Sequence, residues 1–278
     1  SIYPIEIDGT FDDCQNLVKH LFQNLEFKEE VSLGAINSIN WARVAAQIVY
    51  YFSTFQQLQS NRVSFSVPTG NFGDVLAGWV AKKMGLPIDK LIVATNDNDI
   101  LDRAISSGDY FQEEVKATTS PSMDIQISSN FERLLFESLD RDSEKLRNLF
   151  KELEKNNGFR IGNDTLTYIR NDFKSGKASE EKVKDTISRI HKASNIILDP
   201  HTAVGFYASA SELNCDVPMV NLGTAHPAKF SKAVIDSIGL EPEIPDRLKN
   251  IINKKEKFTQ LENNSEALIS FIRKHSNV

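Results

Sequence analysis

The chain has 278 residues and a formal net charge of −6, and 40% of its residues are hydrophobic while 25% are charged. This composition is typical of an ordinary globular protein, and the acidic balance argues against a nucleic-acid-binding surface. No apolar run reaches the length of a membrane span. The two cysteines, Cys14 and Cys215, have no metal-ligand spacing around them. We therefore expect reduced thiols in a cytoplasmic protein, with a disulfide left open as the alternative.

The first elements are predicted from alternation and from helical periodicity. Residues 2–7 alternate apolar and polar side chains, which is typical of a strand, and a helix carrying Cys14 follows. A longer helix begins after Asn37 and Ser38. Its apolar positions are too many for a single stripe, so we expect it to be buried on most sides. Arg43 lies within this helix and would then need an anionic partner, either a structural carboxylate or a substrate phosphate or carboxylate.

Residues 63–74 carry the most informative local pattern. A buried strand is predicted at 63–67, and Gly70, Asn71, Phe72 and Gly73 then turn the chain into a helix. The two glycines permit positive φ and a close approach to a ligand. Backbone N–H groups and the helix dipole at such a turn form a cradle for a phosphate. A plain strand-to-helix connection can carry the same residues, so the pattern alone leaves both interpretations open.

The next elements extend this pattern into a sheet. An apolar strand is predicted at 91–94, and a helix over 97–106 ends at Gly108. Alternating strands and helices imply a mainly parallel sheet with helices on both faces. Such sheets bind ligands at the carboxyl ends of their strands, where the loop at 70–73 would lie.

From about residue 128 to 192 the strand pattern stops. The sequence there is charged and helical in period, so we interpret it as a helical insertion outside the sheet, without a strand from about 140 onward. The sheet is predicted to resume with an apolar run at 195–200. A small-residue helix follows, and then a further buried strand at 218–222.

Few residues match a catalytic pattern by themselves. His201 and His226 follow predicted strands, but a histidine at a helix entrance is more often a structural hydrogen-bonding residue. No spacing fits a metal site, and there is no nucleophile elbow or Walker loop. Thr224 follows the last core strand, where its hydroxyl could bond a heteroaromatic nitrogen or cap the next helix. Lys229 is a cation near the same strand ends, although a lysine after a turn is usually solvated.

Seven segments together resemble threonine synthase, in the fungal and enterobacterial branch of that family. They occur in the family's order across most of the chain, which makes the match far more specific than a single loop. The segments are 9–15 (GTFDDCQ), 37–43 (NSINWAR), 68–74 (PTGNFGD), 94–101 (ATNDNDIL), 128–133 (SSNFER), 199–205 (DPHTAVG) and 224–230 (TAHPAKF).

The resemblance implies an α/β fold-type II pyridoxal-phosphate enzyme, similar to the β subunit of tryptophan synthase. Such an enzyme has a mainly parallel sheet flanked by helices, here with a helical insertion. The family is a group of lyases of threonine biosynthesis. Its members convert O-phospho-L-homoserine and water to L-threonine and phosphate by β,γ-elimination and replacement, with pyridoxal 5'-phosphate as cofactor.

The family's binding residues carry over to positions of this chain. Backbone N–H groups of the loop would hold the cofactor phosphate, and a threonine hydroxyl would bond the pyridine nitrogen. The cofactor-binding candidates are Gly70, Asn71, Phe72, Gly73, Asp74 and Thr224. The substrate-binding candidates are Asn37, Ser38, Arg43 and, more weakly, Lys229.

The resemblance also divides the chain into domains. It implies a remnant of the smaller domain at 1–36, a large cofactor-binding domain at 37–245 with the insertion at about 128–192, and a C-terminal helical tail at 246–278. The family's Schiff-base lysine lies in an N-terminal motif resembling His-Gly-Pro-Thr followed by Phe-Lys-Asp. Neither this motif nor the family's Ser-Gly-Asp-Thr-Gly turn occurs here.

We therefore assign no catalytic residue to this chain. We expect it to depend on an N-terminal portion that carries the lysine and to be inactive by itself. Two alternatives stay open. One is a catalytically inactive relative that keeps a cofactor or phosphate pocket, and the other is a lyase that acts on O-phosphohomoserine without making threonine.

Overall fold

The computed structural model of the chain describes residues 2–9, 11–37, 40–251 and 254–276. The chain forms two compact units, one from 1–36 and 244–278 and the other from 37–243. The domain limits that the resemblance implies stay a prediction, because compactness alone does not define the domains of a family.

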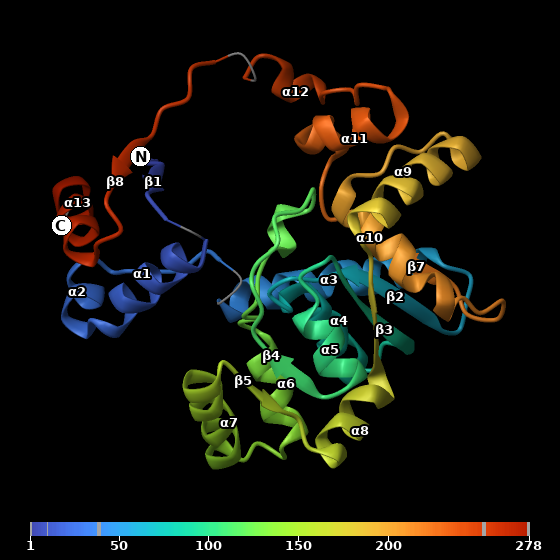
Figure 1. Ribbon diagram of the computed structural model, residues 1–278, viewed down its shortest axis with the longest axis horizontal. Helices are drawn as coiled ribbons and strands as arrows, with labels where there is room; N and C mark the ends of the chain where they lie inside the picture. The colour runs from blue at the N-terminus through green and yellow to red at the C-terminus, as the bar shows by residue number, and fades with distance from the viewer. Residues whose placement is uncertain (1, 10, 38–39, 252–253, 277–278) are drawn as a thin grey trace. The chain divides into compact units, whose positions relative to one another are not determined.

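The larger unit is built on a sheet of four parallel strands in the order β6–β3–β2–β7. Figure 1 shows these strands among the helices that surround them. The strands are β2 (Val63–Pro68), β3 (Ile88–Thr95), β6 (Phe173–Lys177) and β7 (Met219–Asn221). The strands predicted at 63–67, 91–94 and 218–222 and their parallel arrangement are thereby confirmed.

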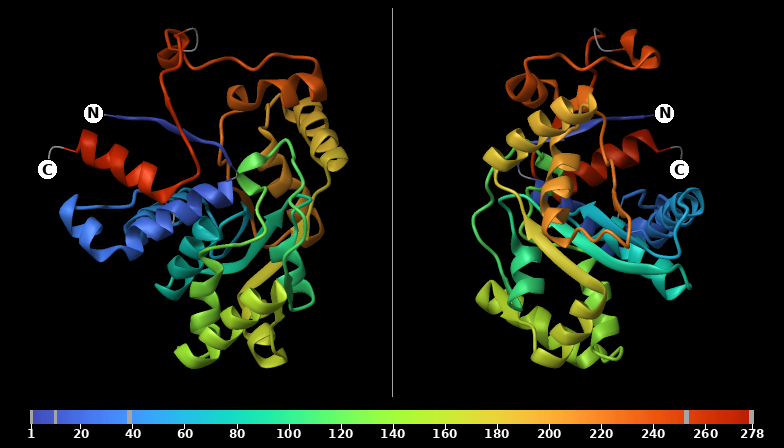
Figure 2. Two further views of the ribbon diagram at one scale, coloured as in Figure 1. Left: turned by 60° about the vertical axis from the view of Figure 1, so that its left-hand side comes forward. Right: turned by 90° about the vertical axis from the view of Figure 1, so that its right-hand side faces the viewer.

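Helices cover both faces of this sheet (Figures 1 and 2). On one face α10 packs against the strands and α9 packs against α10, while α11 packs against α9. On the other face α4 and α5 contact the strands, and α3 packs against α4. These helices are α3 (Trp41–Gln57), α4 (Gly73–Lys83), α5 (Ile100–Ser106), α9 (Glu180–Ser194), α10 (Pro200–Ser209) and α11 (Ser231–Ile238).

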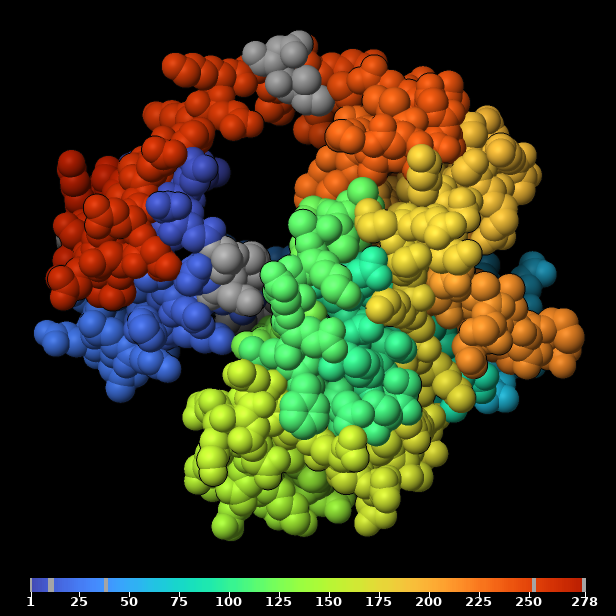
Figure 3. All heavy atoms as spheres, in the orientation of Figure 1, coloured from blue at the N-terminus to red at the C-terminus, as the bar shows by residue number. Residues whose placement is uncertain are grey.

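The remaining elements of the larger unit lie outside the main sheet. β4 (Asp109–Phe111) and β5 (Gly158–Arg160) form an antiparallel pair. The helices are α6 (Phe131–Ser138), α7 (Ser143–Asn156) and α8 (Asn163–Asp172), and the short 3-10 helices are η1 (Pro121–Met123), η2 (Ala210–Glu212) and η3 (Pro227–Phe230). The segment from 112 to 130, drawn in green, lies on the face of the larger unit that Figure 3 turns to the viewer.

The two faces of the sheet follow from the alternation of side chains along its strands. In β3, Leu91 and Val93 join the core with α4 and α5, whereas Ile92 joins the core with α9 and α10. β2 places serines on the α10 side. The Oγ of Ser66 donates to the carbonyl oxygen of Gly205 at 2.8 Å, so small residues on both elements let α10 lie close to the strand.

The interpretation of 140–192 as a segment without strands was wrong. β6 lies at the edge of the main sheet and pairs with β3 from Leu91↔Phe173 to Thr95↔Lys177. Its sequence is Phe-Lys-Ser-Gly-Lys, and of its five residues Phe173 alone is buried. An edge strand pairs through its backbone on one side, so it needs little of the apolar alternation that reveals a central strand.

The strand predicted at 195–200 was also wrong. Asn195 adopts the left-handed conformation, with φ 59°, where α9 ends, and Asp199 caps α10. The residues between them pair with no strand in the described part of the chain, and Ile196 is 56% exposed. The edge position beside β3 belongs to β6.

The expectation that the helix carrying Arg43 is buried on most sides was wrong as well. Of the residues of α3, Val44 and Tyr51 are buried, whereas Trp41 is 48% and Val49 66% exposed. α3 packs against α4 along one side, so several of its other apolar positions are only partly buried and others are exposed. Arg43 itself is exposed and does not face the cost of a buried charge.

The smaller unit combines both ends of the chain. β1 (Ile5–Ile7) pairs in parallel with β8 (Thr259–Leu261), so the strand predicted at 2–7 is confirmed for its second half. Arg273 donates from Nε and Nη2 to the two carboxyl oxygens of Glu30 at 2.7 and 2.6 Å, a paired geometry typical of arginine and carboxylate. The helices are α1 (Phe11–Gln23), α2 (Leu25–Glu30), α12 (Asp246–Lys249) and α13 (Ser265–His275).

We predict that Gly176→Ala destabilises the larger unit. A Cβ at Gly176 in β6 would lie 3.0 Å from the Cβ of Ala208 and 3.1 Å from both its Cα and its carbonyl oxygen, so α10 would have to move. Overpacking of this kind costs about 1–3 kcal/mol. Unfolding in denaturant measures this loss of unfolding free energy. Ser175→Ala in the same strand is the control, and its unfolding free energy should fall by less than about 1 kcal/mol. Equal losses for the two variants would contradict the prediction.

Candidate functional site

The loop between β2 and α4 leaves the sheet at the carboxyl ends of its strands. The N–H of Thr69 donates to the carbonyl of Ala94 at 2.8 Å, which continues the pairing with β3 past the end of β2. Phe72 then adopts a left-handed conformation, with φ 65°, directly before α4. This conformation is uncommon for a residue with a side chain, and the fully buried ring of Phe72 packs against Phe131 and Phe173. The aromatic packing offsets the backbone strain.

The carbonyl groups of this loop are bound on one side by the residues before α6. Ser128 Oγ donates to the carbonyl of Gly70 at 2.8 Å, and the N–H and Nδ2 of Asn130 both donate to the carbonyl of Asn71. In a trans peptide the N–H points opposite to the carbonyl oxygen. The N–H groups of Asn71 and Phe72 therefore point away from Ser128 and Asn130, and the N–H of Phe72 meets no acceptor within the described ranges.

Gly70 is needed here because the segment around η1 comes very close to it. A Cβ at this position would lie 2.8 Å from the carbonyl oxygen of Ser122 and 3.2 Å from the Cα of Met123. Both are backbone atoms, which cannot turn aside as a side chain can. The glycine therefore allows the loop and the residues of η1 to border the same space.

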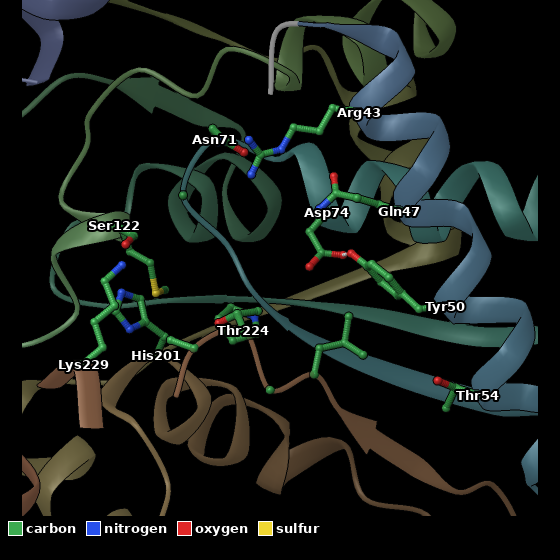
Figure 4. Close-up of a pocket in the computed structure, with 16 residues that line it drawn as sticks. Arg43, Gln47, Tyr50, Thr54, Asn71, Asp74, Ser122, His201, Thr224 and Lys229 are labelled. Atoms are coloured by element: carbon green, nitrogen blue, oxygen red, sulfur yellow. Dashed lines mark hydrogen bonds between the residues drawn. The ribbon is translucent and has the colours of Figure 1, made fainter. Parts of the chain in front are cut away.

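That space is a cavity of about 640 Å³ at the carboxyl ends of β2 and β7 (Figure 4). Figure 4 shows four residues of α3 along one side of it and Ser122, His201 and Lys229 along the other. The lining residues are Arg43, Gln47, Tyr50, Thr54, Pro68, Gly70, Asn71, Asp74, Ser122, Met123, His201, Leu222, Gly223, Thr224, Ala225 and Lys229.

Most of the candidates named from the sequence meet at this cavity. Those that line it are Gly70, Asn71, Asp74, Thr224, Arg43 and Lys229. Phe72 and Gly73 contribute backbone beside it, and the N–H of Gly73 is already bound to Asn71 Oδ1 at 2.9 Å. Asn37 is described but is not one of the lining residues, and Ser38 lies outside the described residues.

Sequence reasoning missed three residues of α3 and undervalued His201. Arg43, Gln47, Tyr50 and Thr54 follow one another at spacings of four, three and four, which places them on one face of a helix. That spacing was the signal that could have added Gln47, Tyr50 and Thr54 to the candidates once Arg43 was chosen. Ser122 precedes no recognisable motif, and the sequence held no comparable signal for it.

Asp74 is a partly buried carboxylate that accepts hydrogen bonds from two tyrosines of α3. The Tyr50 hydroxyl donates to its Oδ1, and the Tyr51 hydroxyl donates to the same oxygen at 2.9 Å. Burial raises the pKa of Asp74 above its usual value, against the lowering effect of both hydroxyls. Burial and the neighbouring carboxylate also raise the pKa of Tyr50 and of Tyr51, which keeps both phenols protonated as donors.

His201 is held at the start of α10 by the residue that caps this helix. Asp199 accepts from the N–H groups of His201 and Thr202, from the Thr202 hydroxyl, and from Nδ1 of His201 at 3.0 Å. Both Asp199 and His201 are buried. The other ring nitrogen of His201, Nε2, is buried too and has no hydrogen-bond partner among the residues that the structure describes.

Thr224 follows β7 and exposes its hydroxyl at the cavity. The alternative role weighed for it, capping the next helix, belongs to His226, whose Nδ1 accepts from the N–H of Ala228 at 3.2 Å. Lys229 places its ammonium 5.4 Å from the centre of the Phe230 ring. Thr224 and Lys229 are thus both accessible to a ligand from the cavity.

Comparison with known proteins relates this chain to one family. The family described as "Threonine synthase, C-terminal" matches residues 202–272. A threonine synthase from Pseudomonas aeruginosa is 43% identical over 281 residues, covering all of this chain and 60% of that protein. The chain is a homologue of threonine synthase. It spans about 60% of the length of the relatives that it matches.

Solved structures of the same family share its fold. The crystal structure of a threonine synthase from Brucella melitensis, described as bound to pyridoxal phosphate, is 48% identical with a TM-score of 0.91 and covers 100% of this chain and 60% of that one. The yeast threonine synthase is 41% identical with a TM-score of 0.85, and the match covers 98% of this chain and 59% of that one. The predicted α/β fold of a fold-type II pyridoxal-phosphate enzyme, a parallel sheet with flanking helices, is confirmed.

No helix in the described part of the chain has the length and apolar character needed to cross a bilayer. Within the same residues, no group of three or more histidine, cysteine and carboxylate side chains is close enough to hold a metal ion. Cys14 and Cys215 are both free thiols.

The carboxylate of Asp74 gives a prediction about pH. The pKa of Asp74 is raised in the folded state above 3.8, so its contribution to stability is complete below that pH and is lost as the pH rises through the folded value. The asparagine side chain of Asp74→Asn does not titrate. The stability of the variant minus that of the wild type should therefore increase with pH above about 3.8.

Unfolding in denaturant at pH values from about 3 to 7 measures this difference. Asp142→Asn is the matched control, because the pKa of Asp142 is shifted in the opposite direction to that of Asp74. The pKa of Asp142 is lowered, chiefly by hydrogen bonds from the N–H groups of Lys145 and Glu144 at the start of α7. For Asp142→Asn the same difference should fall with rising pH. A flat or falling difference for Asp74→Asn would contradict the account of this site.

Proposed function

We propose that this chain forms the cofactor and substrate cavity of an enzyme that converts O-phospho-L-homoserine and water to L-threonine and phosphate. The observation that carries the proposal is the meeting of the 70–73 loop and Thr224 at one cavity of about 640 Å³. A loop with N–H groups at the start of an eleven-residue helix suits a phosphate, and a neutral hydroxyl suits a pyridine nitrogen.

The residues present fit pyridoxal phosphate. The N–H of Phe72 has no acceptor in the described ranges, and the carbonyls of Gly70 and Asn71 are bound on the side away from it. Asp74 would repel a phosphate if its charge were unshielded, but two phenol hydroxyls bind its carboxyl group. When bound, the cofactor supplies the electron sink that elimination of phosphate from the substrate requires.

The remaining candidates would orient the substrate. Arg43 and Lys229 line the cavity as cations, and they suit the phosphate and carboxylate groups of O-phosphohomoserine. Asn37 and Ser38, which precede α3 in the sequence, complete the set that we propose for substrate binding. Thr224 would keep the pyridine nitrogen unprotonated, because a neutral hydroxyl can donate to it without giving up its proton.

We place the lysine that binds the cofactor covalently outside this chain, in the portion that the full-length relatives have in addition. Lys229 lines the cavity, but it does not lie in a segment that resembles the family's lysine motif. The chain by itself would then bind pyridoxal phosphate without turning over the substrate.

An assay of phosphate release and threonine formation tests this function. With pyridoxal phosphate and O-phospho-L-homoserine, the complete natural protein should release phosphate and form threonine in equal amounts, and the 278-residue chain should do neither. Phosphate release without threonine would favour the lyase that makes no threonine. If the complete protein shows no turnover but binds pyridoxal phosphate, it is instead an inactive relative.

The role of Thr224 gives a binding prediction. Thr224→Ala removes one hydrogen bond to the cofactor, so the dissociation constant for pyridoxal phosphate should rise roughly two- to tenfold, the equivalent of about 0.5–1.5 kcal/mol. Absorbance titration of the 278-residue chain measures it. Thr224→Ser keeps the hydroxyl and serves as the control, expected to bind like the wild type. Equal weakening by both substitutions would assign the effect to packing and not to the hydroxyl.

A further inference from the structure

His201 has one nitrogen whose function within the protein is clear. Its Nδ1 lies 3.0 Å from Oδ1 of Asp199, and Asp199 also caps α10 through the N–H groups of His201 and Thr202. A carboxylate oxygen can only accept, so Nδ1 carries the hydrogen of this bond. The pair fixes the ring orientation and leaves Nε2 as the ring atom available to anything else.

The other nitrogen, Nε2, is left without a partner in a buried place. His201 is 4% exposed, and its Nε2 is buried with no hydrogen bond to any described residue, yet His201 lines the cavity. A buried polar atom without a partner is costly, and such atoms in native proteins call for an explanation. A ligand in the cavity would supply the missing partner.

Charges around the cavity indicate what kind of ligand atom this is. The ring of His201 lies 4.7 Å from the ring of Phe230, and the ammonium of Lys229 lies 5.4 Å from the centre of the same ring. Arg43 lines the cavity as a further cation. Asp74 is the one carboxylate among the described lining residues, and two tyrosines bind it.

An excess of cations and a helix N-terminus at His201 together favour an anionic oxygen. To bind such an oxygen, Nε2 must carry a hydrogen and donate it. The carboxylate of Asp199, on the opposite nitrogen, balances the charge of a doubly protonated ring. This arrangement distinguishes His201 from a histidine that merely fills space in the core.

We propose that His201, held by Asp199, donates from Nε2 to an anionic oxygen of the ligand in this cavity, with Lys229 as the neighbouring cation. The inference rests on the proposed function for the identity of that ligand. The phosphate of O-phosphohomoserine and the phosphate or phenolate oxygen of pyridoxal phosphate share this chemistry. Inorganic phosphate, pyridoxal phosphate and pyridoxal, which has the phenolate but no phosphate, separate these sources.

The test is a titration of the chain, labelled with ¹⁵N at its five histidines, with each of the three probes. The Nε2 signal of His201 is assigned by its loss in His201→Gln. At least one probe should move that signal toward the position of a hydrogen-bearing nitrogen, in a saturable way. A response to pyridoxal identifies the phenolate as the anion, and a response to the two phosphates alone identifies a phosphate.

Substitutions make the test quantitative. A charge-assisted hydrogen bond is strong, so His201→Gln should weaken binding of the responding probe on the order of tenfold. Asp199→Asn keeps the cap of α10 but removes the charge, and it should weaken binding severalfold. His191→Gln is the matched control, because His191 also has a buried nitrogen without a partner in the described chain but does not line the cavity. It should leave binding unchanged.

The outcomes separate this inference from the proposed function. If none of the probes moves the His201 signal, or if His201→Gln binds them as the wild type does, the inference is wrong. Saturable binding of pyridoxal phosphate in that case would leave the proposed function standing. If inorganic phosphate moves the signal while pyridoxal phosphate does not bind, the inference stands and the proposed function falls.

Discussion

The structure of the site depends on how the loop between β2 and α4 is fixed. Two of its carbonyl groups are bound by Ser128 and Asn130, and the ring of Phe72 is buried between two other aromatic rings. These contacts hold a left-handed backbone at Phe72 that would otherwise be unfavourable. Because the carbonyls are bound on one side, the N–H groups of the loop point to the other, at the start of α4. The same arrangement could not form without Gly70, whose missing side chain leaves space for the backbone of Ser122.

Electrostatics at this site are set by two carboxylates, the partly buried Asp74 and the buried Asp199, and each is bound by several donors. Asp74 would oppose the binding of a phosphate at the neighbouring loop, but two tyrosine hydroxyls of α3 bind it. Asp199 is bound by two backbone N–H groups, a hydroxyl and an imidazole. α3 and α10 lie on opposite faces of the sheet, and each contributes one polar network to the cavity at its end. The sheet therefore positions both networks relative to the loop.

The sequence predicted the elements whose residues are buried and alternate, and it missed those that are not. β2 and β3 are central strands with strong apolar patterns, and both were predicted, as was the loop that connects β2 to α4. β6 was missed because an edge strand with four polar or small residues carries no such pattern. The apolar run at 195–200 resembled a strand, but it starts at a left-handed residue where α9 ends, runs into the start of α10, and pairs with no strand in the described part of the chain.

The residues of the site were likewise predicted where the sequence carries a recognisable pattern and missed where it does not. Residues that resemble a family motif, such as Thr224 and Arg43, were found from the sequence, although the burial expected for Arg43 was wrong. His201 was interpreted as a structural histidine, since only the structure shows that one nitrogen is bound to Asp199 while the other is left buried without a partner. Whether a buried polar atom has a hydrogen-bond partner depends on contacts between residues that are distant in the sequence, and one sequence does not reveal these contacts.

The most direct measurement is a crystal structure of the chain with pyridoxal phosphate bound. The account predicts the phosphate at the N–H groups of the loop from Gly70 to Gly73 and the pyridine nitrogen within hydrogen-bond distance of the Thr224 hydroxyl. A cofactor whose phosphate lies elsewhere, with the loop and Thr224 making no contact to it, would contradict the central claim that this cavity is the cofactor site.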